Sequence, residues 1–454
     1  MKFIIWGTGK YFNRYRTFIN LSDVVAFVDN NKGKWGTQLD NIPIISPDTL
    51  CEYTYDYILI MAAKYNEIRL QIKYMDINLE NVIDIEHPGI FKNYVLQRKY
   101  DVIREYKGKG KIALFSHTLD RTGAPLVLFN MAKILVDMGY EVDLYSFGSD
   151  KMVIDFLQMG VPVTMFFNKN FDENYCYELI SKYDMVIVNT IVLYKLIALL
   201  ESANKPVIWW LHEEEDYMRK VIEEGMNVIP YEKLSIYGVS DRVQEAFNKY
   251  YQNIPCELLP YGIEYNFDEK KEKNNKIIFA IIGTVCKRKG QHILLEAIAE
   301  NVSEWKDRAQ FWIIGDIKQE EKHKFEECEL VKVIGECNHS EVMKLYKDID
   351  VVVCPSLNDP LPVVVAEGMQ QRKVCIVSDM TGMSKYIRQY QNGLVCKANN
   401  SKDLCMCIQW VIDNIDKADE IGRKAYEIYK NNFSIESFRD RITSIVETCV
   451  SKRC

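Results

Sequence analysis

Two acidic residues, Asp359 and Glu367, stand eight positions apart across a proline-rich turn. The turn follows a run of strand-forming residues at 351–353 and leads into segment 363–369, which predicts a helix. One carboxylate would then lie on a loop and the other about one turn into the helix. Free backbone N–H groups at a helix start attract phosphate. Acids that accept hydrogen bonds from sugar hydroxyls, placed beside such donors, suit a sugar nucleotide.

A second candidate group follows the buried-strand pattern at 277–282. It begins with Gly283 and Thr284 and continues with three consecutive cations, Lys287, Arg288 and Lys289. A nucleoside diphosphate gains negative charge as its bond to a sugar breaks, and fixed cations stabilise that charge without a metal. A cluster of surface charges is the alternative, but the position directly after a buried strand favours phosphate binding.

Two further candidates lie where strands of an open α/β sheet would end. His212 follows the strand pattern at 206–211, and Gly123 with Ala124 lies between the strand pattern at 112–115 and a helix that starts near Pro125. The carboxyl ends of parallel strands are where such sheets bind ligands. A neutral imidazole there can hydrogen-bond a sugar hydroxyl. A structural histidine and a plain connecting loop remain the alternatives.

The first residues of the chain carry a weaker nucleotide signal. A strand pattern at 3–6 leads into a turn with Gly7 and Gly9, and Asp29 lies about 20 residues further on, where a ribose-binding acid would fall. Phe12 stands where the third glycine of a dinucleotide fingerprint belongs. A ligand-free scaffold, in which the glycines only form the turn, is equally compatible with this pattern.

Composition excludes several classes of protein. The chain has 454 residues, 27% of them charged, and a formal net charge of -7, which argues against nucleic acid as a main partner. Its 13 cysteines lack paired CxxC spacing, so no metal site is expected, and Cys286, Cys354 and Cys375 fall in apolar runs that predict buried, reduced thiols. No apolar run approaches the roughly 18 residues of a membrane span. Residues 1–6 are too short for the apolar region of a signal peptide.

Strand patterns alternate with helical ones along most of the chain, which predicts an α/β protein with parallel sheets. We expect a Rossmann-like accessory domain at 1–98, a second domain at 110–265 and a third at 275–432. Charged linkers at 107–111 and 264–276 would separate them. A final helix, within 433–454, would cross back to the second domain.

The Asp359–Glu367 segment resembles the E-x7-E element of retaining glycosyltransferases of family 4, which adopt the GT-B fold of two Rossmann-like domains facing a cleft. Here Asp359 replaces the first Glu, and Pro360-Leu361-Pro362-Val363 replaces the usual Gly-Phe-Gly-Leu. Lys289-Gly290 and His212 match the family, whereas Thr284 stands where the family has Arg. Residues 1–98 are similar to the N-terminal domain of sugar-nucleotide acetyltransferases.

The resemblance implies a cytoplasmic transferase that moves a sugar from a nucleotide-diphosphate sugar to a glycan or lipid-linked acceptor, in bacterial surface polysaccharide synthesis and with retention at the anomeric carbon. Glu367 would bind the ribose and Asp359 the sugar ring, while Lys289 and Arg288 would face phosphate. The remaining substrate-binding candidates are Gly123, Ala124, Gly283, Thr284, Leu361, Pro362 and Val363. No cofactor is implied, and peripheral contact with the inner face of the membrane is an added expectation.

Two rival functions belong to other classes. Because Thr284 and Asp359 depart from the family pattern, the chain could be a scaffold that binds a nucleotide sugar without turning it over. An NAD(P)-dependent oxidoreductase led by the first domain is the other rival, but the sequence offers no Tyr-Lys or Cys catalytic pattern for it.

Overall fold

The computed structural model describes residues 2–451 except 17, 18, 20, 63, 76, 85–107, 149–151, 166–172, 229 and 266–274. The chain forms two compact units. One contains residues 1–125 and 135–186, and the other contains 126–134 and 187–454. Helices connect most of the strands of each of the three sheets, and most strand pairs are parallel, as the alternating patterns predict. Of the predicted linkers at 107–111 and 264–276, residues 107 and 266–274 lie outside the described residues.

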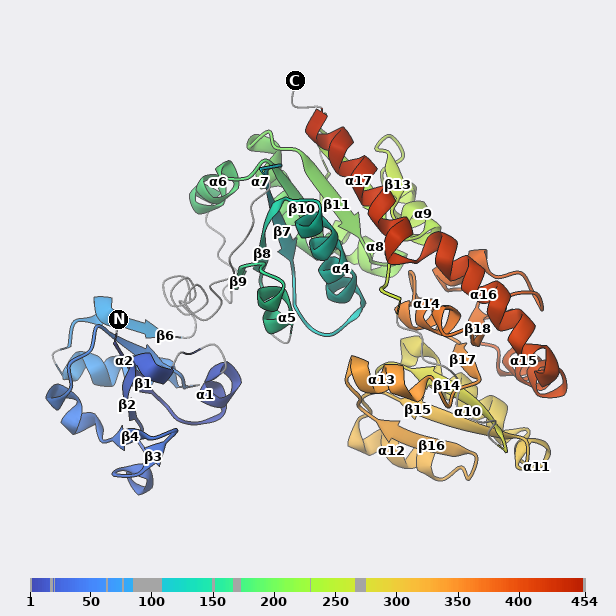
Figure 1. Cartoon of the computed structure of the whole chain (residues 1–454), viewed down its shortest axis with the longest axis horizontal. Coiled ribbons are helices and arrows are strands. Elements are labelled where there is room, and N and C mark those ends of the chain that lie inside the picture. Colours follow the sequence, from blue (N-terminus) through green and yellow to red (C-terminus); the bar gives the residue numbers. More distant parts are fainter. Residues whose placement is uncertain are drawn as a thin grey trace. The chain divides into compact units, whose positions relative to one another are not determined.

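The first sheet, within residues 3–84, has the strand order β3-β4-β2-β1-β5-β6 (Figure 1). Its strands are β1 (Phe3–Trp6), β2 (Val24–Val28), β3 (Gln38–Leu39), β4 (Ile42–Ile45), β5 (Tyr57–Ile60) and β6 (Val82–Asp84), with helices α1 (Lys10–Tyr15) and α2 (Tyr65–Tyr74). Alternate residues of β1 enter two separate buried clusters, Ile4 and Trp6 in one and Phe3 and Ile5 in the other. Both faces of the sheet are therefore covered, which is typical of a parallel sheet.

The second sheet has seven strands in the order β13-β12-β11-β10-β7-β8-β9. The strands are β7 (Lys111–Ser116), β8 (Glu141–Ser146), β9 (Val163–Met165), β10 (Met185–Asn189), β11 (Val207–Leu211), β12 (Leu234–Gly238) and β13 (Cys256–Leu258). The helices are α4 (Gly123–Asp137), α5 (Val153–Gln158), α6 (Glu173–Ser181), α7 (Tyr194–Ser202), α8 (Glu215–Glu223) and α9 (Asp241–Tyr250). All five residues of β11 are buried, which explains their uninterrupted apolar run.

The third sheet has six strands in the order β16-β15-β14-β17-β18-β19, and all its printed pairs are parallel. The strands are β14 (Ile277–Ile282), β15 (Ala309–Ile314), β16 (Val331–Gly335), β17 (Val351–Cys354), β18 (Val374–Ser378) and β19 (Leu394–Cys396). The helices are α10 (Gln291–Ala299), α11 (Val302–Trp305), α12 (Gln319–Glu326), α13 (His339–Leu345), α14 (Val363–Gln370) and α15 (Ser401–Asp413). Strand β14 is central, and β17 pairs beside it, so the two candidate loops leave the same edge of the sheet.

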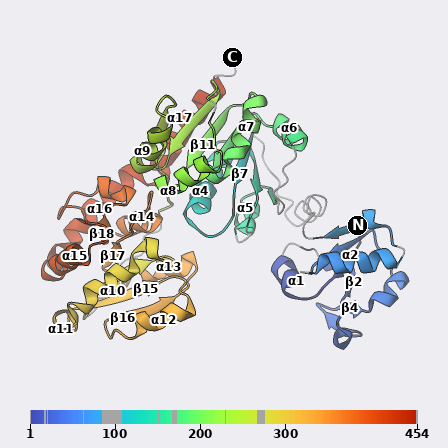
Figure 2. The same cartoon turned by 180° about the vertical axis from the view of Figure 1, so that it is seen from behind.

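Two consecutive helices close the chain, α16 (Ala418–Asn432) and α17 (Ile435–Ser451). The two views agree that α16 lies by the third sheet and that α17 runs along β11 and α9 (Figures 1 and 2). Phe438 stacks on Trp210 of β11 with ring centroids 5.6 Å apart, and an Arg441 guanidinium nitrogen donates to the Pro260 carbonyl at 3.2 Å. The final helix therefore reaches the second sheet, as the sequence predicts.

Most expected strands are found within one or two residues of their predicted bounds, but two expectations need correction. Lys111 belongs to β7 and not to a linker. Cys354 and Cys375 are buried as predicted, whereas Cys286 is exposed because it lies in the turn beyond β14.

Candidate active site

The turn after β14 places a lysine over the third sheet's carboxyl edge. Residues Lys287–Lys289 form one short helical turn that ends at Gly290, whose φ is +75°. A Cβ atom at Gly290 would lie 2.2 Å from the Pro355 carbonyl oxygen, so this position needs glycine. The tight turn directs Lys289 toward Asp359, while Lys287, Arg288 and Thr284 are exposed.

Asp359 is the buried acid of this site, with 6% of its surface exposed. Its Oδ2 accepts from Lys289 Nζ at 2.7 Å and from an Arg288 guanidinium nitrogen at 3.4 Å. Burial alone would lower the pKa of Lys289, but the neighbouring Asp359 carboxylate outweighs it and the net shift is upward. Lys289 therefore stays a cation where it contacts Asp359, although the sequence had assigned the two residues to different parts of the ligand.

Glu367 is buried on the fifth residue of α14, about one turn from its start, as predicted. Its Oε1 lies 2.8 Å from His339 Nε2, and its Oε2 accepts from the Tyr346 hydroxyl at 3.3 Å. Sequence reasoning missed both neighbours, because α13 and the segment after it are far from Glu367 in sequence. A carboxylate oxygen can accept more than one hydrogen bond, so Glu367 can still receive ligand hydroxyls.

Tyr261 is a further residue that sequence reasoning missed. Its side chain is 2% exposed, and its hydroxyl has no hydrogen-bond partner among the residues that the structure describes. Burial, together with the negative charges of Asp359 and Glu367, raises the Tyr261 pKa well above its ordinary value. A neutral hydroxyl donor thus lies within electrostatic range of both acids. The sequence did not indicate a functional role for Tyr261, because a tyrosine in an apolar Leu-Pro-Tyr-Gly run is usually a core residue.

His212 follows β11 directly, as predicted, and its ring packs edge-on against Trp210 at a centroid distance of 4.5 Å. The next residue, Glu213, fixes this strand end, because its Oε2 accepts from the backbone N–H of Ile191 at 2.9 Å and of His212 at 3.0 Å. Burial raises the pKa of Glu213 to about 7 in spite of these donors.

A pH-dependent stability follows from Glu213. Its folded-state pKa of about 7 lies above the ordinary value of 4.5, so the folded chain holds a proton that the unfolded chain releases in this window. The contribution is complete below pH 4.5 and is lost as the pH rises through 7, by up to about 3 kcal/mol. We expect Glu213→Gln to remove this decline. Denaturant unfolding of both proteins at several pH values between 4.5 and 8 measures it, and parallel curves would contradict it.

The other predicted residues occupy the following places. Gly283 has a φ of +131°, and Thr284 accepts from the Gln291 amide at its carbonyl, at 3.2 Å. Leu361 is buried, Pro362 precedes α14 and Val363 begins it. Gly123 and Ala124 are the first residues of α4 and belong to the first compact unit. The structure thus brings Lys289, Arg288 and Asp359 together in direct contact.

In the first module, Asp29 is engaged by its own surroundings. Its carboxylate accepts from Asn31 N–H at 2.9 Å, from Lys34 Nζ at 2.7 Å and from both polar groups of Thr8. Burial opposes ionisation, but Lys34, Thr8 and Asn31 outweigh it and lower the Asp29 pKa. Gly7 has a φ of +111° and passes close to the Met61 carbonyl, while Gly9 precedes the short helix α1. A nucleotide site here stays a prediction.

In the described part of the chain, no cluster of three or more His, Cys, Asp or Glu side chains is arranged to hold a metal ion. No helix in the same residues combines the length and the apolar character needed to span a membrane.

Comparison with known proteins decides the family. Residues 263–428 match the model described as glycosyl transferases group 1, and residues 107–235 match the model described as glycosyl-transferase family 4. The chain belongs to these glycosyltransferases. Together the two glycosyltransferase models span most of the second and third predicted domains. Residues 1–83 match a third model, described as C2185-like, N-terminal.

Individual relatives of this glycosyltransferase are distant. An alpha-D-kanosaminyltransferase of Streptomyces kanamyceticus is 21% identical over 39% of this chain and 47% of its own length. A Campylobacter jejuni protein, N,N'-diacetylbacillosaminyl-diphospho-undecaprenol alpha-1,3-N-acetylgalactosaminyltransferase, is 28% identical over 36% of this chain and 46% of its own length. The chain thus spans about half the length of these curated relatives.

Solved structures are similar to this chain over a longer stretch than the curated relatives are. The Anabaena protein HepE, in a crystal structure with UDP-glucose, aligns with a TM-score of 0.64 and 18% identity, covering 75% of this chain and 100% of that one. At this identity the alignment establishes the fold, which is GT-B preceded by an additional small α/β domain, as predicted.

Proposed function

We propose that this glycosyltransferase transfers a sugar from a nucleotide-diphosphate donor to a glycan or lipid-linked acceptor. The observation that carries the proposal is the grouping of Lys289, Arg288 and Asp359 at the loops that follow β14 and β17, with Glu367 on the next helix. Cations suit the diphosphate, and acids suit the hydroxyls of the sugar and ribose. The hydroxyl of Tyr261, which has no hydrogen-bond partner among the described residues, supplies one more donor near these acids.

In the proposed mechanism the fixed cations stabilise the charge that develops on the departing diphosphate, with no metal or other cofactor. The acceptor hydroxyl attacks from the face that the leaving group vacates, its proton passes to the leaving phosphate oxygen, and the anomeric configuration is retained. Such a route needs no pair of catalytic carboxylates of the glycosidase type. The roles of His212, Gly283, Thr284, Leu361, Pro362 and Val363 in this site, and of Gly123 and Ala124 beside the acceptor, are part of the proposal.

The setting we propose is bacterial surface polysaccharide synthesis at the cytoplasmic face of the membrane, with peripheral contact to it. The name of the Campylobacter relative includes a diphospho-undecaprenol acceptor, and the HepE structure contains UDP-glucose, so UDP-sugars and lipid-linked acceptors are the first compounds to test.

The test measures nucleotide binding and nucleotide release separately. Calorimetry with UDP, GDP and dTDP identifies the base, and UDP release from a sugar-nucleotide panel, with and without lipid-linked acceptors, measures turnover. Proton NMR of the product then gives the anomeric configuration. Failure to bind any nucleotide would refute the proposal. Nucleotide binding without UDP release from any pair of sugar nucleotide and acceptor would favour the non-catalytic scaffold, the alternative suggested by Thr284 and Asp359. Thermal protection of the chain by NADH would favour the oxidoreductase.

A further inference from the structure

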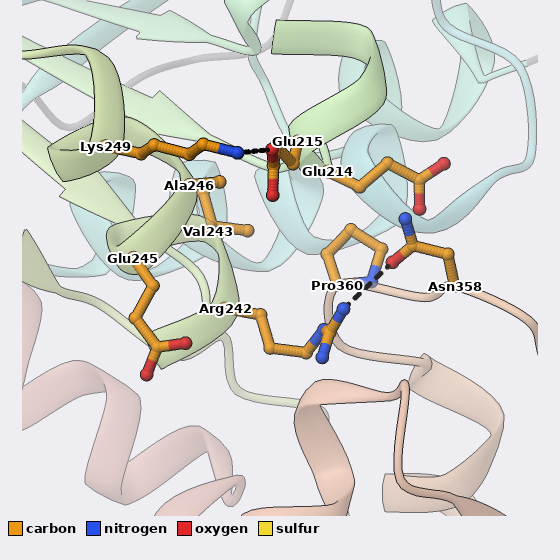
Figure 3. A pocket seen from close by; sticks show the side chains of 9 residues that line it. All are labelled: Glu214, Glu215, Arg242, Val243, Glu245, Ala246, Lys249, Asn358 and Pro360. Atoms are coloured by element: carbon orange, nitrogen blue, oxygen red, sulfur yellow. Dashed lines mark hydrogen bonds and ion pairs between the residues drawn. The ribbon is translucent and has the colours of Figure 1, made fainter. Parts of the chain in front are cut away.

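A pocket of about 310 Å³ is lined in part by two residues of the loop that carries Asp359, Asn358 and Pro360 (Figure 3). It is enclosed by the start of α8, by α9 and by the loop between β17 and α14. Its lining residues are Glu214, Glu215, Arg242, Val243, Glu245, Ala246, Lys249, Asn358 and Pro360. A cavity of this size falls at the lower end of the range that holds small ligands.

The pocket adjoins the residues assigned to the donor sugar. Asn358 and Pro360 line the pocket and flank Asp359, whose own carboxylate is held by Lys289 and Arg288. Glu214 lies close enough for the charges of Arg288 and Asp359 to influence its pKa, which burial raises. A ligand in the pocket would therefore lie one side chain away from the proposed reaction centre.

Two charged groups of the pocket are left with unused hydrogen-bonding capacity. Glu214 Oε2 is buried and has no hydrogen-bond partner within the described part of the chain. Arg242, which extends toward Asn358 and Pro360 in Figure 3, forms no ion pair in the same residues. Its contacts are weak, at 3.5 Å to Asn358 Oδ1 and 3.7 Å to Met380 Sδ. Buried polar atoms without partners are costly, so a ligand that pairs with them binds favourably.

The remaining charges in the lining are already paired. Lys249 pairs with Glu215, and Glu245 accepts from Lys385 Nζ at 2.7 Å. With these pairs formed, Glu214 and Arg242 are the one acid and the one cation left in the lining, so the pocket offers an acidic ligand no excess positive charge. Val243, Ala246 and Pro360 add an apolar surface against which the C–H face of a sugar ring can pack. Hydroxyl donors for Glu214 and hydroxyl acceptors for Arg242 and Asn358 complete the match.

We propose that this pocket binds an uncharged sugar ring of the acceptor, with Glu214 and Arg242 holding its hydroxyls. The inference rests on the proposed function, because it assigns the second substrate of that reaction. Asn358 connects the two subsites, since its backbone carbonyl accepts from an Arg288 guanidinium nitrogen at 2.9 Å while its side chain faces the pocket.

Saturation-transfer NMR with methyl glycosides tests the proposal on the full chain at saturating UDP. The probes are methyl glycosides of glucose, galactose and N-acetylglucosamine, with methyl glucuronide as the acidic counterpart. We expect at least one neutral glycoside to bind. Its dissociation constant should rise at least about tenfold in Glu214→Ala and in Arg242→Ala, because each loses a hydrogen bond to a charged group. Methyl glucuronide should bind more weakly than methyl glucoside to the unmodified chain.

Arg219→Ala is the matched control. Arg219 lies on the same helix α8 and pairs with Asp216, but it does not line the pocket, so its replacement should leave glycoside binding unchanged. UDP affinity and the thermal midpoint, measured on every variant, report on donor binding and folding. Absence of glycoside binding in the UDP-loaded chain, equal binding by the pocket variants, or preference for the glucuronide would overturn the inference. Failure of the unmodified chain to bind UDP, GDP or dTDP would instead refute the donor site.

Discussion

Replacing Lys289 by methionine should lower the turnover number by roughly one to three orders of magnitude. The ammonium lies 2.7 Å from Asp359 Oδ2 on the loop where we place the leaving diphosphate. Methionine keeps most of the side-chain volume but removes the charge, and Arg288, 3.4 Å from the same oxygen, would be the nearest cation left. UDP release at saturating donor and acceptor measures the effect.

The neighbouring Lys287 supplies the control, because it is exposed and belongs to the same turn. Lys287→Met removes an equal charge and should change turnover far less. A thermal-unfolding scan of both variants accounts for the cost of leaving the buried Asp359 with one cation fewer. Equal losses in the two variants would mean that the positive charge of the turn acts only at long range, and an unchanged Lys289→Met would remove Lys289 from the mechanism.

Replacing Glu367 by glutamine should raise the dissociation constant for the nucleotide by about ten- to a hundredfold. The carboxylate already accepts from Tyr346, lies 2.8 Å from His339, and in our proposal also accepts from two ribose hydroxyls. Glutamine has the same shape but only one accepting oxygen, and its amide nitrogen would face a hydroxyl donor. Calorimetric titration with the nucleotide that the panel identifies gives the comparison.

Glu296→Gln provides the reference for this experiment, because Glu296 is exposed on α10 of the same sheet and should not influence the nucleotide. The free nucleoside adds a second check, since Glu367 is assigned to the ribose and not to the phosphates. The loss of affinity should therefore appear for the nucleoside as well as for the diphosphate. A loss confined to the diphosphate would place Glu367 elsewhere in the site.

The strands of all three sheets were largely predictable because most of them are buried on both faces. An unbroken apolar run such as Ile277–Ile282 can only be satisfied in that environment, and its ends are marked by Gly283 and by charged residues. Strands that depart from this pattern were not predicted from the sequence. β4 contains Pro43, β9 has only three residues, and β13 has two exposed residues out of three.

The sequence alone determined that Lys289, Asp359 and Glu367 lie at one edge of the third sheet. Parallel strands all present their carboxyl ends at the same edge, so residues that follow β14 and β17 must gather there. What the side chains touch could be decided only by the tertiary structure. The Lys289–Asp359 pair, the contacts of Glu367 with His339 and Tyr346, and the buried hydroxyl of Tyr261 join segments from different parts of the chain. Hydrogen bonds act over about 3 Å, and only packing brings such groups that close.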